Sequence, residues 1–440
     1  MYASSTLKHL VRKSGQRSFC VAKKNTAVDP RHSKIIVLGA GFSGLVASAY
    51  IPKISKVKNF EIRMFDPQVN HIYTPNLDLL PYDIKTLDQI EKPVFQLTNN
   101  AINLEFSSIA SINPANNTVV TKDNREYSYD YLVLATGLQP RIDKVDGLQE
   151  ALEERDDGVV STSSVEGILK YKRKLDSLIA GDIIFYSDER TKSFGSALNQ
   201  ALLTDAFLRE NRGPGLRNMS RLQYVTSRRT LFPSVKYSIK IQELLKNKNI
   251  EFDNYGLKLV EVDAKSKTAL FRNLDSDKKV EKKYEILLAN PEYELPEALK
   301  PLADNNGDLN IHPQTLIHEQ YSNILALGHC TRSNNFIPSR RSTLEQGVTL
   351  AYNLRSILEA GGAPKKLVRY SGVTEIPLFV ESRTCLPVRI DPKLPDLVTR
   401  PSTVDYYKEA HILPELYFRL LSKGLWFENT GLRVPQLSAL

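Results

Sequence analysis

Three glycines, Gly39, Gly41 and Gly44, have the spacing of a loop that binds the pyrophosphate of a dinucleotide. In such a loop the first glycine permits a tight turn, and the second lets the backbone approach the phosphates. The third glycine lets the following helix pack closely on a strand. Asp66 follows after about twenty residues, where an acidic side chain can hydrogen-bond the adenosine ribose. The chemistry indicated is therefore the binding of a nucleotide cofactor.

Two strands and a helix must hold these residues in place. The apolar run 35–38 leads into the glycines, a helix-like run follows them, and FEIRMFDPQ supplies a second short strand that ends in Asp66. Because these pieces occur in the right order, we predict a βαβ dinucleotide-binding unit rather than a glycine turn of another α/β fold. The helix N-terminus would then face the phosphates.

A second candidate is Cys330, which follows His329 at the end of the apolar run NILALGHC. The chain has three cysteines, at positions 20, 330 and 385, and none of them is in a CxxC pair. This spacing supports neither a disulfide framework nor a metal site. We expect no metal, and no Ser/His/Asp triad stands out.

The charge of the chain is concentrated at its N-terminus. The formal net charge is +9, but residues 1–24 hold six Lys or Arg and no acid, which leaves 9 − 6 = +3 for the remainder. That remainder is ordinary for a globular protein and gives no support to nucleic-acid binding. Residues 1–24 have the composition of a mitochondrial transit peptide, with a disordered basic tail as the alternative. No apolar run approaches the roughly 18 residues of a membrane span.

A second α/β block follows the first. GDIIFYS (181–187), LQYVTS (222–227), TALFRNL and YEILLAN (284–290) are predicted strands, and YSIKIQELLKNKNI is a predicted helix. The segment DERTKSFGSALNQ after the first of these strands contains no GxGxxG. We therefore expect no NAD(P) in this block.

From about residue 34 to 427, the chain resembles the mitochondrial type of sulfide:quinone oxidoreductase. The resemblance rests on several segments in order: GAGFSG, HIYTPNLDLL (71–80), YDYLVLATG, TLFPSVKYSIKIQELL (230–245), LVEVDAKSKTALFRNL, HPQTLIHEQYSNILALGHCT and LPELYFRLLSKGLWF. It implies FAD in the first domain, two redox cysteines that take sulfide, and electron transfer to ubiquinone near a membrane-facing C-terminal region. It also implies that Ala135-Thr136-Gly137 is the turn that returns the chain to the nucleotide.

Three chemistry-bearing positions depart from the family pattern. The first redox cysteine belongs to a Lys-Cys-Ala-Gly-Ala-Pro segment, and we match its position to Phe194 in KSFGSALNQ. The second belongs to a Ser-Cys-Pro-Leu segment and matches Ile376 in TEIPL. The family's flavin-binding Gly-Asp pair is Gly328-His329 here. The resemblance therefore predicts no catalytic residue and a ribityl contact that has lost its carboxylate.

The predicted fold is α/β, with two Rossmann-like domains, the first discontinuous, and a C-terminal amphipathic region. The expected boundaries are 34–150 and 291–365 for the FAD domain, 151–290 for the second domain and 366–440 for the C-terminal region. In that region the helical segment 404–427 either lies on a membrane surface or packs on its own core or a dimer partner. Arg340 and Arg341 are expected as a solvated surface pair, with contact to a flavin edge as the alternative.

Three functions remain open. The first is a mitochondrial, matrix-side homologue that keeps FAD and has lost sulfide oxidation. The second is an active FAD enzyme that passes electrons from sulfide or another donor to ubiquinone. The third is a structural subunit of a mitochondrial assembly. Ubiquinone or the inner-membrane surface, a second copy of the chain and a mitochondrial protein are the partners considered.

Overall fold

The computed structural model describes residues 33–54, 60–154, 157–232, 234–332, 338–360, 366–396 and 398–424. The expected transit peptide at 1–24 lies outside these residues, as does Trp426 of the C-terminal segment.

The first domain is built on a five-stranded sheet whose strands are all parallel. Its order is β20-β9-β1-β2-β5, and its strands are β1 (Ser33–Leu38), β2 (Phe60–Phe65), β5 (Ile102–Glu105), β9 (Tyr131–Leu134) and β20 (Ile324–Ala326). The last of these comes from the NILALGHC segment, so the chain returns to the first sheet after the second domain is complete. This return explains why the first domain is discontinuous in sequence.

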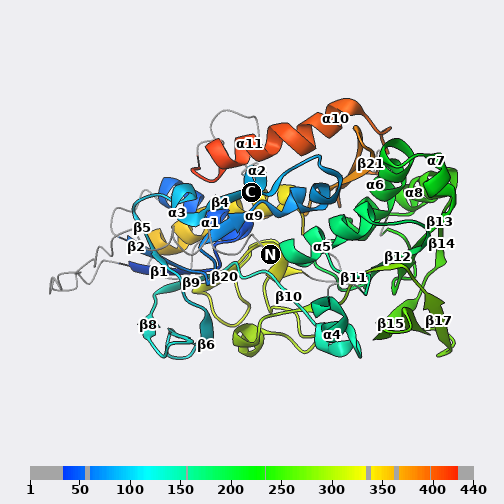
Figure 1. Cartoon of the computed structure of the whole chain (residues 1–440). Helices are drawn as coiled ribbons and strands as arrows, with labels where there is room; N and C mark the ends of the chain where they lie inside the picture. Colours follow the sequence, from blue (N-terminus) through cyan, green and yellow to red (C-terminus); the bar gives the residue numbers. More distant parts are fainter. Residues whose placement is uncertain are drawn as a thin grey trace, which may run out of the picture. The chain divides into compact units, whose positions relative to one another are not determined.

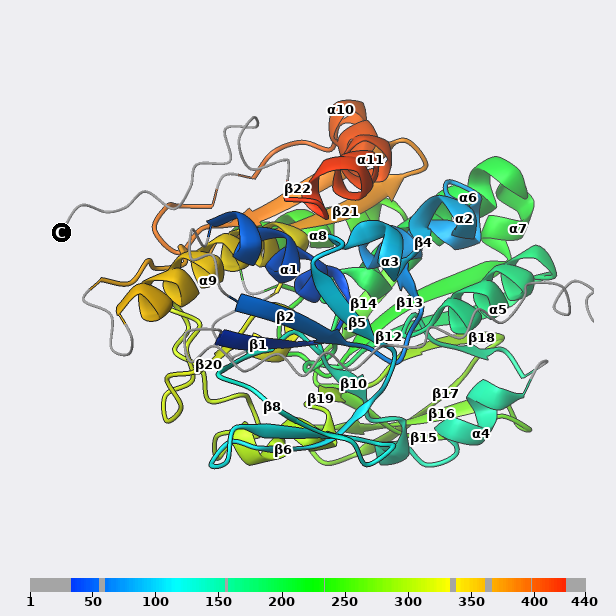
Figure 2. The same ribbon diagram turned by 90° about the vertical axis from the view of Figure 1, so that its left-hand side faces the viewer.

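Two helices cover one face of this sheet, α1 (Phe42–Ile54) and α9 (Arg340–Ala360) (Figures 1 and 2). They approach closely, because a Cβ added to Gly347 of α9 would overlap the Val46 side chain of α1. Val46 is fully buried in the core cluster that both helices share with the sheet. Helix α1 is thus held between the sheet and α9.

The second domain has its own five-stranded parallel sheet, in the order β11-β18-β12-β13-β14. Its strands are β11 (Val159–Val160), β12 (Gly181–Ser187), β13 (Ser220–Thr226), β14 (Ile250–Asn254) and β18 (Ile286–Asn290), and its helices are α5 (Val165–Asp176), α6 (Ser196–Asn211), α7 (Pro214–Asn218) and α8 (Val235–Asn247). The predicted strands of this block are present. TALFRNL is a strand too, but as β16 (Thr268–Asn273) it lies between β15 (Leu257–Asp263) and β17 (Lys279–Lys283) in a separate antiparallel sheet.

Smaller elements lie outside the two five-stranded sheets. A 3-10 helix spans Thr74–Tyr82, and α2 (Leu87–Ile90), α3 (Val94–Leu97) and α4 (Leu148–Glu153) are short helices. The short strands are β3 (Asn70–Ile72) with β4 (Glu91–Pro93), β6 (Ile109–Asn113) with β7 (Thr118–Thr121) and β8 (Glu126–Ser128), and β10 (Gln139–Pro140) with β19 (Tyr293–Glu294). Short 3-10 turns lie at Ile142–Lys144, Glu297–Leu302 and Gly328–Thr331.

The C-terminal region consists of a hairpin and a helical segment. The hairpin pairs β21 (Thr374–Glu381) with β22 (Thr384–Ile390). The helical segment runs through α10 (Thr403–Tyr407), a π-helical stretch at Lys408–Ile412, α11 (Leu413–Leu416) and a second π-helical stretch at Tyr417–Leu421.

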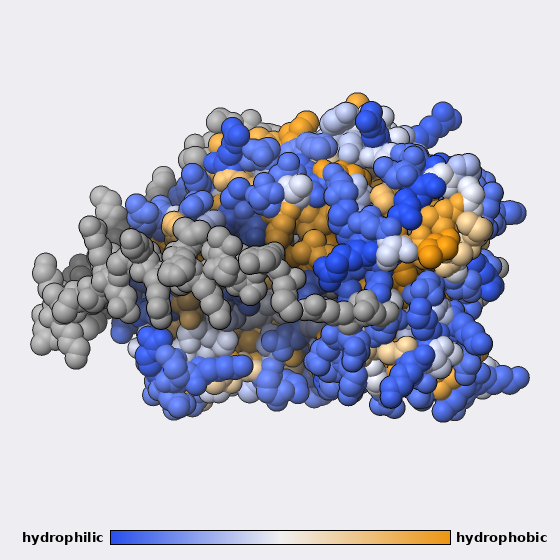
Figure 3. Space-filling view, viewed as in Figure 1, coloured by the Kyte–Doolittle hydropathy of each residue, from blue (hydrophilic) through white to orange (hydrophobic). Residues whose placement is uncertain are grey.

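This helical segment packs on the first domain of its own chain. Tyr417 is fully buried, stacks on Phe42 with ring centroids 4.7 Å apart, and bonds through its hydroxyl to Nε2 of His71 at 3.0 Å. Of the alternatives for segment 404–427, packing on its own core is therefore what the described residues adopt. No helix in the described ranges is both long and apolar enough to cross a membrane. On the face drawn in Figure 3, apolar residues form separate areas within a mostly hydrophilic surface.

Candidate functional site

The glycine loop after β1 has the shape of a phosphate cradle. Gly39 has φ +101°, and a Cβ on it would lie 2.5 Å from the carbonyl oxygen of Ala135. A Cβ on Gly44 would overlap the carbonyl oxygen of Gly39. In contrast, a Cβ on Gly41 would meet nothing within 4 Å, and this glycine is exposed. Two glycines are thus required by the fold, whereas Gly41 keeps open the space before the α1 N-terminus.

Asp66 holds this loop from the end of β2. Its carboxylate accepts hydrogen bonds from the backbone N–H of Ala40 at 2.6 Å and of Gln68 at 2.7 Å. Partial burial raises its pKa, and these two bonds oppose that shift. The contact with a ribose that we expect of Asp66 stays a prediction, since the observed bonds are to the backbone.

The carboxyl ends of three neighbouring strands meet at this loop. The N–H of Ala135 bonds to the carbonyl of Leu38 at 2.8 Å, which places the turn Ala135-Thr136-Gly137 against the glycine loop. Gly328 follows β20 with φ +80° and donates its N–H to Gln346 of α9 at 2.8 Å. A Cβ on Gly328 would overlap the Ser43 hydroxyl. The predicted nucleotide-site residues therefore converge on the edge of a parallel sheet where ligands bind.

His329 stands next to Gly328 at the edge of a pocket. Burial, and to a smaller extent the charges of Lys192 and Arg332, lower its pKa to about 3. The imidazole is therefore neutral at physiological pH. No described residue hydrogen-bonds the imidazole, so its ring nitrogens are available to a ligand hydroxyl.

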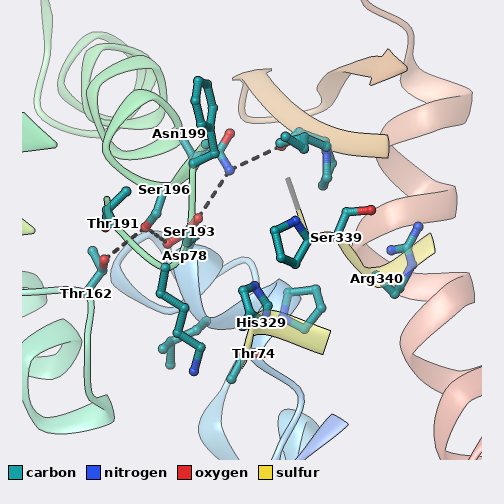
Figure 4. A pocket seen from close by; sticks show the side chains of 18 of the residues that line it. Thr74, Asp78, Thr162, Thr191, Ser193, Ser196, Asn199, His329, Ser339 and Arg340 are labelled. Carbon is teal, nitrogen blue, oxygen red and sulfur yellow. Dashed lines mark hydrogen bonds between the residues drawn. The ribbon is translucent and has the colours of Figure 1, made fainter. Parts of the chain in front are cut away.

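The pocket lies between the two domains and the C-terminal hairpin, with a cavity volume of about 150 Å³ (Figure 4). Its wall includes both predicted redox positions, Phe194 and Ile376. Phe194 and Ile376 belong to one core cluster, and a Cβ added to Gly195, the residue after Phe194, would lie 2.9 Å from Cγ2 of Ile376. The structure thus brings together three positions selected from the sequence: 194, 329 and 376.

None of the described residues that line this pocket is a cysteine. Cys330 is buried and donates its S–H to the carbonyls of Leu134 and Leu327, and burial raises its pKa to about 12. Cys385 is buried within β22, and burial raises its pKa as well. Both thiols are held in the unreactive, protonated form, which supports the view of Cys330 as a bystander.

Phe194 is held firmly in the pocket wall. Its ring packs edge-on against Phe232 at 4.6 Å, and the Arg228 guanidinium lies 3.9 Å from its centroid. The exposed residue before it, Ser193, also lines the pocket. If Lys192 and Gly195 are matched to the Lys and Gly of the family segment, Ser193 takes the cysteine's place. Neither alignment places a cysteine in the pocket wall, and the match of the first family cysteine to Phe194 stays a prediction.

Arg340 differs from its expected role. It is not half of a solvated surface pair: its side chain is 9% exposed and pairs at 2.5 Å with Glu409, which is 1% exposed. Glu409 belongs to the C-terminal helical segment, so this buried pair fastens that segment to the N-terminus of α9. Arg341 is more exposed and pairs with Glu375 at 3.1 Å.

Most residues of the pocket wall were not selected from the sequence, and Asp78 is one that makes several hydrogen bonds. Asp78, from the 3-10 helix, accepts hydrogen bonds from Ser196 at 2.6 Å and from Asn199 and Gln200 at 3.2 Å, all in the first turns of α6 (Figure 4). Asp78 lies within the quoted segment HIYTPNLDLL, but nothing in its local pattern indicates that it would reach a helix of the other domain.

The chain is similar in sequence to a family model and to several characterised oxidoreductases. Residues 33–181 match the family model described as pyridine nucleotide-disulphide oxidoreductase. Mitochondrial sulfide:quinone oxidoreductases from Mus musculus and Dictyostelium discoideum are 24% and 28% identical, each over 92% of this chain and 89% of the relative.

Two solved structures share the fold. The sulfide:quinone oxidoreductase of Aquifex aeolicus has a TM-score of 0.77 at 17% identity and covers 89% of this chain and 92% of that chain. A chain in the structure of the Tetrahymena thermophila mitochondrial ATP synthase has a TM-score of 0.75 at 20% identity and covers 92% of this chain and 99% of that chain.

Proposed function

Starting from a chain that resembles the mitochondrial sulfide:quinone oxidoreductases over nearly its whole length, we propose that this protein is a mitochondrial FAD-binding homologue that has lost sulfide oxidation. One observation carries the proposal. The positions matched to the two redox cysteines face one pocket, and the pocket wall offers Ser193, Phe194 and Ile376 but no thiol among its described residues. Sulfide chemistry of this family needs a sulfur that can attack, be attacked and carry a sulfane sulfur.

FAD fits the residues that remain. Gly41 leaves open the space in front of the α1 N-terminus, where the first N–H groups of a helix have no intrahelical partner and bind phosphate. Neutral His329 can hydrogen-bond a ribityl hydroxyl in place of the family's aspartate. When bound, the flavin supplies two-electron redox chemistry, and this chain positions it through Gly41, Asp66 and His329.

Nicotinamide binding is not part of the proposal. In the second domain, the helix N-terminus that would receive a pyrophosphate is α6, and the carboxylate of Asp78 already bonds to Ser196 and Asn199 there. A phosphate group would have to displace this carboxyl group. The missing GxGxxG and the presence of Asp78 therefore both argue against NAD(P) binding in the second domain.

The visible spectrum of the purified protein tests the proposal. We expect bound flavin whose absorbance does not change when sulfide is added. Bleaching by sulfide followed by reoxidation with a quinone would overturn the proposal, and would support the alternative of an active enzyme that passes electrons to ubiquinone at the matrix side of the inner membrane.

Restoring the thiols tests the assigned positions. We expect sulfide-driven bleaching in one of two triple variants, Phe194→Cys or Ser193→Cys, each combined with Ile376→Cys and His329→Asp. The variant that responds shows whether residue 193 or residue 194 takes the place of the first cysteine. Failure of both, in proteins that bind FAD, would show that the positions are misassigned or that further losses matter.

A structural role in a mitochondrial assembly is the second candidate. It is supported by the shared fold of a chain in the Tetrahymena mitochondrial ATP synthase, which this chain matches over 92% of its length. Native purification from mitochondria tests it: co-migration with a large complex, without flavin absorbance, would favour this role. Migration as a free monomer or homo-oligomer with bound flavin would refute it.

A further inference from the structure

Two buried side chains link the C-terminal helical segment to the backbone of the glycine loop. The Tyr417 hydroxyl bonds to Nε2 of His71 at 3.0 Å, and Nδ1 of the same ring bonds to the Ala40 carbonyl at 3.3 Å. The imidazole is neutral at physiological pH, because burial lowers its pKa to about 4. Since a carbonyl can only accept, Nδ1 carries the proton and Nε2 accepts from the Tyr417 hydroxyl. The hydrogen bonds therefore run in one direction, from the C-terminal segment through His71 to the loop.

Ala40 is held on both sides by these contacts. Its N–H donates to the Asp66 carboxylate at 2.6 Å, and its carbonyl accepts from His71. A trans peptide unit is planar and directs its C=O and N–H to opposite sides, so the bond to the Ala40 carbonyl also fixes the direction of the Gly41 N–H. That N–H makes no hydrogen bond with the described residues, and Gly41 leaves the space before α1 open. His71 thus fixes a donor that a phosphate can use.

The C-terminal chain also contacts α1 along its length. Phe42, the first residue of α1, stacks on Tyr417 with ring centroids 4.7 Å apart and planes inclined by 12°. At the other end of α1, Lys53 donates to the carbonyl of Gly424 at 2.5 Å. A Cβ on Gly424 would lie 2.7 Å from the carbonyl oxygen of Ala49, so the two backbones approach closely. The helix that begins at the glycine loop is therefore fixed by the C-terminal chain at both of its ends.

From these contacts we propose that the C-terminal helical segment holds the glycine loop in its nucleotide-binding conformation, with His71 and Tyr417 as positioning residues. The inference rests on the proposed binding of FAD and names what regulates that site. A loop that is already ordered has no ordering cost when the ligand binds. Docking of the segment and binding of FAD then favour each other by the same factor. A partner that drew the segment away from the first domain would weaken FAD binding.

Hydrogen exchange of the flavin-free full chain tests the positioning directly. Tyr417→Phe removes the hydroxyl and keeps the ring that stacks on Phe42. Tyr406→Phe is the matched control, because Tyr406 is a buried tyrosine of the same segment whose ring packs on Phe379 of β21. The net contribution of a neutral hydrogen bond corresponds to roughly 2- to 13-fold in an equilibrium constant. Peptides that cover residues 39–45 should exchange faster by about that factor in Tyr417→Phe and not in the control. Equal exchange of the loop in the two variants would overturn the inference.

Fluorescence titration with FAD measures the consequence for the site. The Kd for FAD should rise roughly 2- to 13-fold in Tyr417→Phe and stay within about twofold of the parent in Tyr406→Phe. An unchanged Kd in Tyr417→Phe would refute the coupling between the segment and the site. A parent chain that binds no FAD would overturn the proposed function instead, and the exchange of the loop would still decide the positioning.

A double-mutant cycle tests whether the Tyr417 hydroxyl acts through His71. In a His71→Leu background, Tyr417→Phe should leave the Kd for FAD unchanged, because the imidazole that connects the hydroxyl to the loop is gone. Additive effects of the two changes would refute the role given to His71. If His71→Leu fails to fold, the comparison of Tyr417→Phe with Tyr406→Phe still decides. In the parent, FAD should also slow exchange in peptides that cover residues 413–421, and no such protection would refute the coupling.

Discussion

Replacing His329 by aspartate should strengthen FAD binding. The imidazole lies at the position that the family gives to a carboxylate, and it is neutral because burial, Lys192 and Arg332 hold its pKa near 3. An aspartate at this place would face the same two cations, so its carboxylate would be ionised and could accept a charge-assisted hydrogen bond from a ribityl hydroxyl.

The expected gain follows from the energy of such a bond. A hydrogen bond to a charged group contributes about 1.5–3 kcal/mol, compared with about 0.5–1.5 kcal/mol for a neutral one. The difference of about 1–1.5 kcal/mol corresponds to roughly 5- to 13-fold in Kd. The gain is limited because the imidazole already supplies a neutral partner.

Fluorescence titration of flavin-free protein with FAD measures this difference. His329→Asn is the matched control, because it has nearly the same shape as aspartate and no charge. We expect His329→Asp to bind FAD most tightly, and His329→Asn to bind FAD about as tightly as the parent protein. If the aspartate variant binds no more tightly than the asparagine variant, the charge at position 329 does not contact the flavin, and the assignment of Gly328-His329 to the flavin site is refuted.

Three further predictions concern the fold around the site. Glu409→Gln leaves buried Arg340 without its partner and should cost about 3–5 kcal/mol of unfolding free energy in urea; a loss below 1 kcal/mol would show that the pair is solvated. Burial lowers the pKa of His71 from 6.5 to about 4. Between pH 6.5 and pH 4 the unfolded state therefore binds a proton that the folded state does not. The free energy of unfolding should fall over this range by about 3 kcal/mol because of this group. His71→Gln should reduce that pH dependence, and an unchanged slope would contradict the assignment. Gly41→Ala should fold normally and lose FAD affinity, whereas Gly44→Ala should fail to fold because its Cβ overlaps a backbone carbonyl; equal stability of the two variants would contradict the roles given to these glycines.

Local patterns were sufficient for much of the fold. The strand before Gly39, the helix after it and the strand that ends in Asp66 depend on residues within a short stretch of chain, and all three are present. Strands β12, β13 and β18 were visible as continuous apolar runs because both faces of a parallel sheet are covered. The return of β20 to the first sheet followed from the family resemblance and not from any local signal.

The candidate site was only partly visible in the sequence. The glycines and His329 lie at strand ends that can be recognised locally. Asp78 could not be selected, because its significance comes from what surrounds it: it accepts a hydrogen bond from a helix of the other domain. The buried state of Arg340 was likewise mispredicted, since its partner Glu409 is far away in sequence.

The sequence by itself determined the glycine spacing of the loop at 39–44 and the placing of its cysteines at positions 20, 330 and 385, because the spacing and the places of a residue type are properties of the chain alone. Only the tertiary structure decided that positions 194 and 376 share one pocket, that Cys330 and Cys385 are kept from it, and that the C-terminal helical segment covers its own first domain. These outcomes depend on how distant segments pack and on which charges packing buries together. No local pattern of residues encodes that arrangement.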